Sequence, residues 1–431
     1  MNREIVNIKM LHESFVTIKH KSGLKIFLKP MKRFSSCKAI FATKYGSVNR
    51  QFKTNREDIF IKVPDGVAHY LEHKLFENED GSVTFELFAN QKAMANAQTS
   101  FDSTAYYFSS PTETFLDALK ILINFVQSPF FTDENVDRER GIINQEIKMN
   151  EDDPEWVTFF KCLEAMYKES AFKVKISGSV SSIANIDKNV LYRCYNAFYN
   201  LNNMALILVG DFNELEVLKL VDENLKFKES VFVERKFELE PYKVNKNYCE
   251  IYMPVKNPIF CMGYKLSPKK RESLLKSKVG LAILCEILLG EGSQLYNEFY
   301  ENCLVSGGEL NYEIFAGENY FALIFSGESS NPKRVSERIS EEINNKKENG
   351  VNEKDFELVK KVIFAKAVKE FSTPSSVASA LFDSYIEDFD ISDKLDFIAN
   401  FNIADIMDCL NIIDTSNYSL AISFPINDKI N

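Results

Sequence analysis

The chain has 431 residues, of which 45% are hydrophobic and 26% are charged, and this composition is typical of a globular protein. Because this length exceeds what one compact core usually takes, we expect two domains of about 200 residues each. The 62 acidic residues outnumber the 52 basic ones and give a net charge of −10, which argues against nucleic acid or an anionic membrane as the main partner.

The first half of the chain alternates short strand patterns with amphipathic helical patterns. Residues 14–20 and 24–28 predict a hairpin, the continuously apolar residues 39–46 predict a central strand, and residues 47–63 predict a polar loop. Further strands are predicted at residues 92–99, 104–109 and 203–210, and further helices at residues 83–90, 113–127, 133–152, 156–168, 188–199 and 214–226. Charged, weakly patterned residues at 228–248 predict a linker between two domains.

The segment Gly66–Phe76, with the sequence GVAHYLEHKLF, predicts a helix with Asp65 as its N-cap. His69 and His73 lie one turn apart on the same face of this helix, with Glu72 beside them. Two imidazoles at this spacing form a preformed site for zinc, and a neighbouring carboxylate can take a proton from water at the metal. A lone histidine on a helix is more often solvated than metal-bound. The chain has only four histidines, however, and two of them fall in this turn, so the pattern predicts a zinc site.

The second half of the chain repeats the first half faintly but in the same order. The aligned pairs are residues 66–75 with 280–289 and 203–206 with 417–420, both at the same offset, and residues 132–154 with 352–374 at a slightly larger one. The second copy keeps the motif helix, but Ile283 and Ile287 replace His69 and His73. We infer two copies of one domain, of which only the first has the two histidines.

A zinc site with two histidines needs a third protein ligand, and the predicted helix at 133–152 offers candidates. Glu139 and Glu146 lie two turns apart on one face of that helix. Acidic helix faces are usually only solvated. In the second copy, however, Val359 and Lys366 replace the two acids. The acids are therefore lost in the copy that loses both histidines, which indicates that the histidine pair and Glu146 work together.

The order His69, Glu72, His73, followed on a later helix by Glu139 and then Glu146, resembles the insulinase (pitrilysin) family of zinc peptidases. The resemblance covers essentially the whole chain and is greatest for the bacterial two-domain, YmfH-like group related to mitochondrial processing peptidase. It implies that His69, His73 and Glu146 bind Zn2+, that Glu72 is the general base, and that Glu139 is an auxiliary acid near the site.

The resemblance also implies a fold and a mode of substrate binding. The fold class is α+β, with an N-terminal catalytic domain at 1–227, a linker at 228–248 and a homologous C-terminal domain without metal ligands at 249–431. Each domain is expected to be a mixed β-sheet packed with helices, and the chain to form half of a clam-like chamber. Asn96 and Ala97 lie in a segment that looks like the family's active-site edge strand, where a peptide substrate adds as an extra strand.

One segment departs from the family's pattern. Active members carry an Arg and a Tyr in the second half that grip the substrate and polarise its carbonyl, and here Tyr300 and Ser306 stand at those positions. We therefore expect a zinc-dependent endopeptidase that works in a heterodimer with a metal-free insulinase-family subunit, or in a homodimer. The alternatives are a catalytically silent scaffold or assembly protein of the same fold, and a structural zinc site. Retention of the full motif together with Glu146 favours catalysis.

The remaining sequence features concern the surroundings of the protein. Eight scattered cysteines without a C-x-x-C pair indicate reduced thiols and a cytoplasmic protein. No run is long and apolar enough to span a bilayer, and the N-terminus lacks an apolar signal region. We expect a peptide substrate, with no nucleic acid and no membrane as partner. A peptide precursor, a leader peptide and oligopeptide debris all fit, and the ligands would also take cobalt or manganese.

Overall fold

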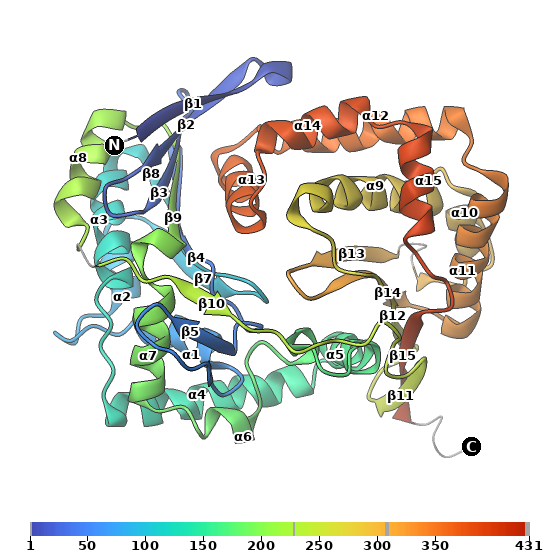
Figure 1. Cartoon of the computed structure of the whole chain (residues 1–431), viewed down its shortest axis with the longest axis horizontal. Coiled ribbons are helices and arrows are strands. Elements are labelled where there is room, and N and C mark those ends of the chain that lie inside the picture. Colours follow the sequence, from blue (N-terminus) through green and yellow to red (C-terminus); the bar gives the residue numbers. More distant parts are fainter. Residues whose placement is uncertain (1, 227–228, 307–309, 427–431) are drawn as a thin grey trace. The chain divides into compact units, whose positions relative to one another are not determined.

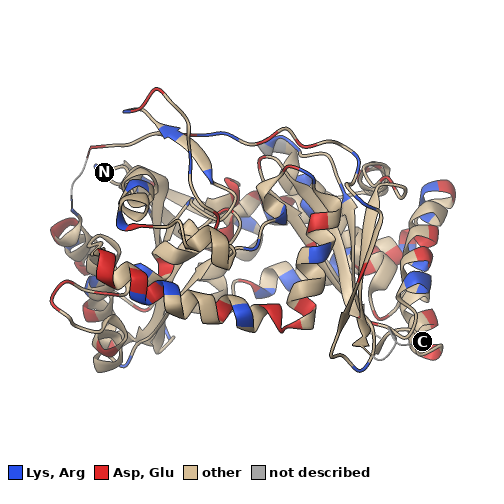
Figure 2. Ribbon diagram, turned by 90° about the horizontal axis from the view of Figure 1, so that it is seen from below, with Lys and Arg blue, Asp and Glu red and all other residues tan. Residues whose placement is uncertain are grey.

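The described chain divides into two units. The computed structural model describes residues 2–226, 229–306 and 310–426 (Figure 1). Unit 1 comprises residues 1–147, 175–236 and 368–392, and unit 2 comprises residues 148–174, 237–367 and 393–431. Acidic and basic residues are interspersed along the helices, whereas the strands are mostly uncharged (Figure 2). Within the described ranges, no helix has both the length and the apolar character needed to cross a membrane.

Unit 1 is built on a seven-stranded mixed sheet with the strand order β1-β2-β3-β9-β4-β8-β7. Neighbouring strands are antiparallel except for the parallel pair β3–β9. The strands are β1 Asn2–Ile8, β2 Glu13–Lys19, β3 Lys25–Pro30, β4 Ser36–Thr43, β7 Met94–Thr99, β8 Thr104–Pro111 and β9 Met204–Gly210. β9 is buried along its whole length, as its sequence MALILVG requires. The edge strand β7 instead alternates exposed and half-buried residues, so only one of its faces packs on the unit.

Helices pack on both faces of this sheet. The helices of unit 1 are α1 Val67–Leu75, α2 Thr84–Asn90, α3 Phe115–Val126, α4 Asp133–Glu151, α6 Val180–Ile183, α7 Lys188–Phe198, α8 Glu214–Asn224 and α13 Pro374–Glu387. One continuous core joins α1, α3, α4, α7 and α8 to the first face, and α13 covers the second face at β4 and β9. The predicted hairpin, strands and helices of the first half are confirmed to within a few residues. The predicted loop at 47–63 is wrong in part, because it contains β5 Gln51–Thr54 and β6 Ile61–Lys62, which form a small sheet with β10 Val233–Arg235.

Unit 2 repeats five strands of the larger sheet, from β3 to the edge strand β7. Its strand order is β11-β15-β12-β14-β13, and its parallel pair β11–β15 takes the place that β3–β9 has in unit 1. The strands are β11 Tyr248–Met253, β12 Ile259–Lys265, β13 Asn311–Ala316, β14 Phe321–Glu328 and β15 Tyr418–Pro425. The helices are α5 Pro154–Met166, α9 Arg271–Leu289, α10 Gln294–Glu301, α11 Pro332–Asn349, α12 Glu353–Lys369, α14 Ile391–Asn400 and α15 Ile403–Asn411. The shared strand order confirms an α+β fold with two homologous halves.

Two helices are exchanged between the halves of the sequence. α5 comes from the first half but packs on β12 and β15 of unit 2, where Met166 lies against β12. α13 comes from the second half but packs on β4 and β9 of unit 1, where the ring centroid of Tyr385 lies 6.3 Å from that of Phe27. Both helices begin with a proline, Pro154 and Pro374, and these two prolines are aligned in the repeat between the halves. The units therefore differ from the predicted domain boundaries, because one face of each sheet is covered by a helix from the other half.

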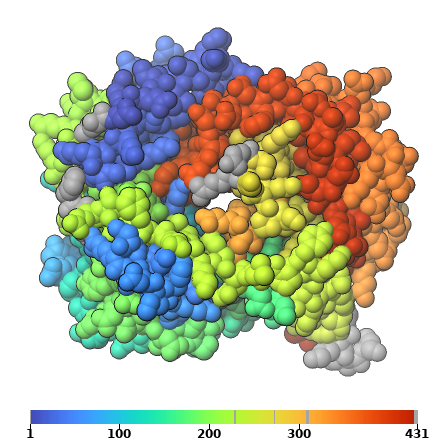
Figure 3. All heavy atoms as spheres, in the orientation of Figure 1, coloured from blue at the N-terminus to red at the C-terminus, as the bar shows by residue number. Residues whose placement is uncertain are grey.

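The predicted linker at 228–248 is divided between the two units over its described residues. β10 pairs with β5 in unit 1. Glu240 of unit 2 accepts hydrogen bonds of 2.6–2.9 Å from the backbone amides of residues 168–170, and it pairs with Lys265 at 2.6 Å. The segment lies on the visible surface in Figure 3, where it is yellow-green, and Leu239 is 93% exposed. Each end of this connection is thus fixed to a folded unit.

Candidate metal centre

A glycine marks the residue where the motif helix α1 begins. Gly66 has a φ of 95°, and a Cβ at this position would lie 2.6 Å from the backbone oxygen of Ser177, so glycine is required for both conformation and space. The predicted cap is wrong, because Gly66 is itself the N-cap residue and Asp65 instead pairs with Arg50 at 3.2 Å. The apolar face of α1, with Leu71 fully buried, faces the core and leaves the opposite face for chemistry.

The two histidines of α1 converge with one glutamate of α4. The rings of His69 and His73 have centroids 4.6 Å apart. The Nε2 atom of His69 lies 3.3 Å from Oε1 of Glu146, and the Nε2 atom of His73 lies 3.4 Å from Oε2 of the same carboxylate. The three side chains are only partly buried, with exposed fractions between 12% and 30%. The structure thus brings together the three residues that the sequence predicts as metal ligands.

The helix α4 is placed so that its second acid also reaches this cluster. Thr132 and Asn135 cap its first turn through reciprocal hydrogen bonds of 2.9 and 3.1 Å. Glu139 lies on its buried face and is only 7% exposed, which is unusual for a carboxylate. The Nδ1 atom of His73 donates to Oε1 of Glu139 at 2.9 Å. This bond fixes the tautomer in which Nε2 of His73 has a free lone pair, so Glu139 contacts a ligand rather than the metal position.

Several further contacts hold α1 and α4 together. The hydroxyl of Tyr70 donates to the backbone oxygen of Val136. The Nζ atom of Lys74 is fully buried, donates to the backbone oxygen of Asn135 at 3.2 Å and pairs with Glu77 at 2.7 Å. A charged group in the core is retained only when it is paired in this way. These contacts give the histidine and glutamate ligands a rigid support.

The electrostatic environment of the site favours a cation. Burial disfavours the charged form of His73, but hydrogen bonds to Glu139 and Glu146 outweigh burial and raise the pKa of His73 to about 10. The imidazoles of His69 and His73 in turn hold the pKa of Glu146 well below its ordinary value. Three carboxylates beside two imidazoles therefore attract a proton, and the same field would attract a divalent metal that displaces it.

The donor set fits zinc. One ligand atom from each of His69, His73 and Glu146 can be chosen so that all three lie within 4.8 Å of one another. Two imidazole nitrogens and one carboxylate oxygen form the ligand set of catalytic zinc sites that keep a position open, whereas closed structural sites use four protein ligands. The candidate ligand group found among the described residues consists of these two histidines and one glutamate and contains no cysteine. The geometry therefore argues against the structural zinc site considered above.

Glu72, the predicted general base, is held by a residue that the sequence analysis did not single out. The Oγ1 atom of Thr99 donates to Oε2 of Glu72 at 2.5 Å. Thr99 is the last residue of β7, and the alternation of that strand turns its side chain to the face where α1 packs. No local pattern marks this residue, because the contact joins two elements that are 27 residues apart in the sequence.

The predicted substrate-binding residues lie on the open edge of the sheet. Among the strands of the described residues, β7 is the last in the order and pairs only with β8. Asn96 is exposed and Ala97 is half-buried on this strand. The backbone amide of Ala97 donates to Oδ1 of Asn96 at 2.8 Å, so a side chain satisfies a donor that does not bond to β8. The structure places both residues where a peptide strand could add, and their role remains a prediction.

Unit 2 shows what replaced the site in the other half. Ile283 and Ile287, at the positions of the two histidines, are buried residues of α9. The position of Glu72 is still a glutamate, Glu286, and the position of Glu146 is Lys366. The Nζ atom of Lys366 pairs with Glu286 at 2.7 Å. In this half an ammonium group thus supplies the positive charge beside the retained carboxylate.

The residues at the predicted substrate-gripping positions do not provide the expected groups. Tyr300 lies on α10 and is 61% exposed. Ser306 is also exposed and donates to Oε1 of Glu328 at 2.8 Å. A serine hydroxyl bonded to a carboxylate is a poor substitute for a guanidinium or a phenol, so these positions do not supply a carbonyl-polarising pair.

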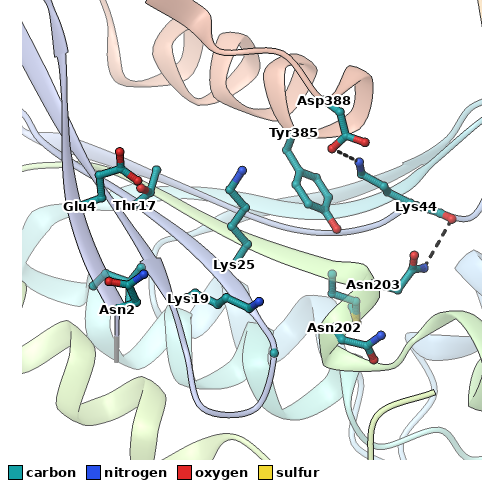
Figure 4. A pocket seen from close by; sticks show the side chains of 13 residues that line it. Asn2, Glu4, Thr17, Lys19, Lys25, Lys44, Asn202, Asn203, Tyr385 and Asp388 are labelled. Atoms are coloured by element: carbon teal, nitrogen blue, oxygen red, sulfur yellow. Dashed lines mark hydrogen bonds and ion pairs between the residues drawn. The ribbon is translucent and has the colours of Figure 1, made fainter. Parts of the chain in front are cut away.

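A separate cavity of about 450 Å³ lies in unit 1 on the side of the sheet that α13 covers (Figure 4). Lys19, Lys25 and Lys44 line it together with Tyr385 and Asp388. Lys44 pairs with Asp388 at 2.5 Å, and its Nζ lies 4.7 Å from the ring centroid of Tyr385. None of the residues predicted for the metal site lines this cavity, so it is distinct from the metal centre.

Comparisons with known proteins agree with this geometry. The family model described as insulinase (peptidase family M16) matches residues 62–179, and the model described as the peptidase M16 inactive domain matches residues 185–363. The zinc protease YmfH of Bacillus subtilis is 33% identical over 410 residues, which cover 94% of this chain and 95% of that protein. All the residues predicted for the metal site lie within the first of the two family matches.

Two further similarities concern the whole fold and the assembly of relatives. The crystal structure of an M16-like peptidase from Alicyclobacillus acidocaldarius has 29% sequence identity, covers 99% of both chains and superposes with a TM-score of 0.91. The β subunit of the mitochondrial-processing peptidase of Caenorhabditis elegans is 27% identical over 162 residues, which cover 37% of this chain and 35% of that protein. The fold of the two halves is therefore shared with this group of peptidases.

Proposed function

The chain belongs to the insulinase family, peptidase family M16, and from this premise we propose that it is a zinc-dependent endopeptidase acting on peptides or unfolded segments. One observation carries the proposal: His69, His73 and Glu146 converge within 4.8 Å, with the carboxylate of Glu72 on the same turn of α1. Relatives named zinc proteases support it.

The residues of the site have separate tasks in the proposed reaction. Zinc, when bound, supplies the Lewis acidity that makes water acidic near neutral pH. The Nε2 atoms of His69 and His73 and the carboxylate of Glu146 would hold it, and Glu139 keeps His73 in the required tautomer. Glu72 then accepts the proton of the attacking water and passes it to the leaving amine, which is general acid–base catalysis.

The proposed substrate binds as an added strand on β7. The free edge of this strand offers backbone hydrogen bonds, which hold an extended peptide without requiring one sequence. Asn96 and Ala97 would provide contacts to the peptide backbone, and the carboxamide of Asn96 would have to release the amide of Ala97 for a peptide carbonyl to reach it. This mode suits unfolded segments, because only an extended chain can pair with a strand edge.

A partner subunit completes the proposal. Peptide hydrolysis needs a group that stabilises the developing oxyanion as well as a water activator. Tyr300 and Ser306 do not offer such a group, so we place it on a second insulinase-family subunit without metal, or on a second copy of this chain. The existence of a relative named as a subunit of a processing peptidase supports this assembly. We place the activity in the cytoplasm, following the cysteine pattern of the sequence.

The proposal is tested by cleavage of a quenched fluorescent peptide library by the purified, zinc-loaded chain. Glu72→Gln is expected to lower the rate by roughly 10²- to 10⁴-fold, because it removes the proton acceptor. Glu79→Gln is the matched control, since Glu79 is exposed and lies beyond the end of α1. Zinc content is measured for each variant so that loss of metal is not mistaken for loss of the base.

Each result has a defined meaning. Cleavage that depends on Glu72 in the chain alone supports the peptidase and refutes the need for a partner. Zinc binding without cleavage, followed by Glu72-dependent cleavage when a metal-free family member is added, supports the two-subunit form. Zinc binding without cleavage in either case refutes the peptidase and favours the silent scaffold, for which the positions of Tyr300 and Ser306 are the favourable observation.

A further inference from the structure

The carboxylate of Glu72, in the second half of α1, has few polar contacts for a proposed general base. Among the described residues, Thr99 is the single hydrogen-bond partner of its side chain, through the 2.5 Å bond to Oε2. No lysine or arginine of the described residues forms an ion pair with it. A glutamate side chain has several rotatable bonds, so a single strong contact decides where its second oxygen lies.

The donor in this contact is itself held in place. Thr99 pairs with Thr104 across the β7–β8 hairpin, and their Oγ1 atoms are 3.4 Å apart. Thr104 is fully buried and donates its hydroxyl proton to the backbone oxygen of Tyr45 at 2.8 Å. Each hydroxyl has one proton. Thr104 uses its proton on Tyr45 and Thr99 uses its proton on Glu72, so the two hydroxyls are in contact without a proton between them, and Thr99 is held by the pairing of its strand with β8.

The duplicated half provides an internal comparison for this pair. The β13–β14 hairpin of unit 2 occupies the same place in its sheet, and its last pair before the turn is Ala316 with Phe321. In β7–β8 the last pair before a turn of the same length is Thr99 with Thr104. The half without histidines thus also lacks the two threonines. Its retained glutamate is held by the lysine described above instead of by a hydroxyl.

We propose that Thr99 is the positioning residue for Glu72. Its hydroxyl holds Oε2 and leaves Oε1 free to take the proton from the attacking water, and the branched side chain of threonine limits the directions in which that hydroxyl can point. The inference rests on the proposed peptidase function of the site. In this inference β7 has two tasks: the strand would bind the peptide backbone, and its last residue, Thr99, orients Glu72.

Removal of the hydroxyl tests the inference. Thr99→Val and Thr99→Ala are expected to lower kcat about 10- to 100-fold, which is the range for a lost hydrogen bond to a charged group. KM and zinc content are expected to stay within twofold of wild type. Thr99→Ser keeps the hydroxyl and is expected to keep kcat within about threefold. Unit 2 has an alanine, Ala316, at the equivalent position. Thr99→Ala therefore keeps the test valid if the valine variant does not fold.

A second measurement distinguishes positioning from general damage to the fold. In the Glu72→Gln background, Thr99→Ala should cause no further loss of activity, because residues that act as a unit are not additive. Crystal structures of zinc-loaded wild type and of the Thr99→Ser and Thr99→Ala variants give a readout that does not depend on turnover. The Glu72 carboxylate should occupy one conformer in the first two proteins and more than one in the third.

The outcomes separate this inference from the proposed function. If Glu72→Gln does not lower the activity of the enzyme, alone or with its partner, the proposed function fails, whatever Thr99 does. If Glu72→Gln abolishes activity but Thr99→Ala keeps the wild-type kcat, the positioning role is overturned. Equal losses in the serine and alanine variants, or a single Glu72 conformer in the alanine variant, would overturn it as well.

Discussion

The exchange of α5 and α13 between the halves makes an unusual prediction about stability. Tyr385→Ala, a change in the second half of the sequence, should destabilise the sheet built from the first half. Met166→Ala, a change in the first half, should destabilise the sheet built from the second half. Tyr385 is 6% exposed and packs near Phe27, and Met166 is fully buried against β12.

The size of both effects follows from the volume removed. Truncation of a buried aromatic or methionine side chain to alanine costs about 2–5 kcal/mol, because lost burial and an unfilled cavity add together. We expect about 3 kcal/mol for each variant, since both side chains are almost fully buried and Tyr385 also borders the cavity of Figure 4. This corresponds to roughly a 100-fold change in the equilibrium between closed and open states of the affected unit.

Hydrogen exchange measured by mass spectrometry reports this change for each segment. In Tyr385→Ala, the amides of β4 and β9 should exchange roughly 100-fold faster, whereas those of β12 and β15 keep most of their protection. Met166→Ala should show the opposite pattern. The two variants control for each other. Equal loss in both units, or loss in the unit that shares the mutated half of the sequence, would refute the exchange of helices as the source of this stability.

The remaining predictions concern the metal site, its counterpart in unit 2 and one buried ion pair. Glu146→Gln should lower zinc affinity more than Glu139→Gln, for which about 10- to 100-fold is expected because that residue acts only through a ligand, and competition with a chelator measures both. Lys366→Ala should leave zinc affinity unchanged and alter stability by less than about 1 kcal/mol in thermal unfolding, since this partly exposed ion pair belongs to unit 2 and contributes no metal ligand. Burial raises the pKa of Glu240, but Lys265 and the three amides outweigh burial and hold this pKa below 4.5. Its ionised form is therefore favoured in the native state, and the stability it contributes is present above pH 4.5 and lost as the pH falls further. Urea midpoints of wild type and Glu240→Gln should accordingly differ at pH 7 and converge toward pH 3.

The convergence of the three candidate metal ligands could be predicted because their relation is local or is marked by the duplication. His69 and His73 share a face of one helix at any position in any fold, since helical periodicity decides this. Glu146 lies on another helix, and its assignment depended on the loss of both acids and both histidines in the second copy. The predicted cap at Asp65 was wrong because a close approach to Ser177 made glycine the better residue at the helix start.

Other features of the site could be recognised only in the folded structure, because they join elements that are far apart in the sequence. The hydrogen bond from Thr99 to Glu72 joins a strand end to a helix. Nothing in the sequence distinguishes Thr99 from other threonines in strands. The role of Glu139 as the partner of His73 likewise depends on how α4 packs on α1. The strands β5 and β6 were missed because they are short and polar, and their pairing with β10, far away in sequence, is what makes them strands.

The sequence by itself determined the motif helix, the candidate metal ligands, the duplication and most secondary structure, because each of these depends on spacings within one element or on a repeat between two halves. Only the tertiary structure decided which sheet each exchanged helix covers, which hydroxyl bonds to Glu72 and which charged group lies beside Glu286 in unit 2. The repeat between the halves indicated that α5 and α13 are equivalent helices. It did not predict which sheet each of them packs on. Apolar helix faces fit any complementary sheet, so the partner is chosen by the packing of the whole chain and not by the helix sequence.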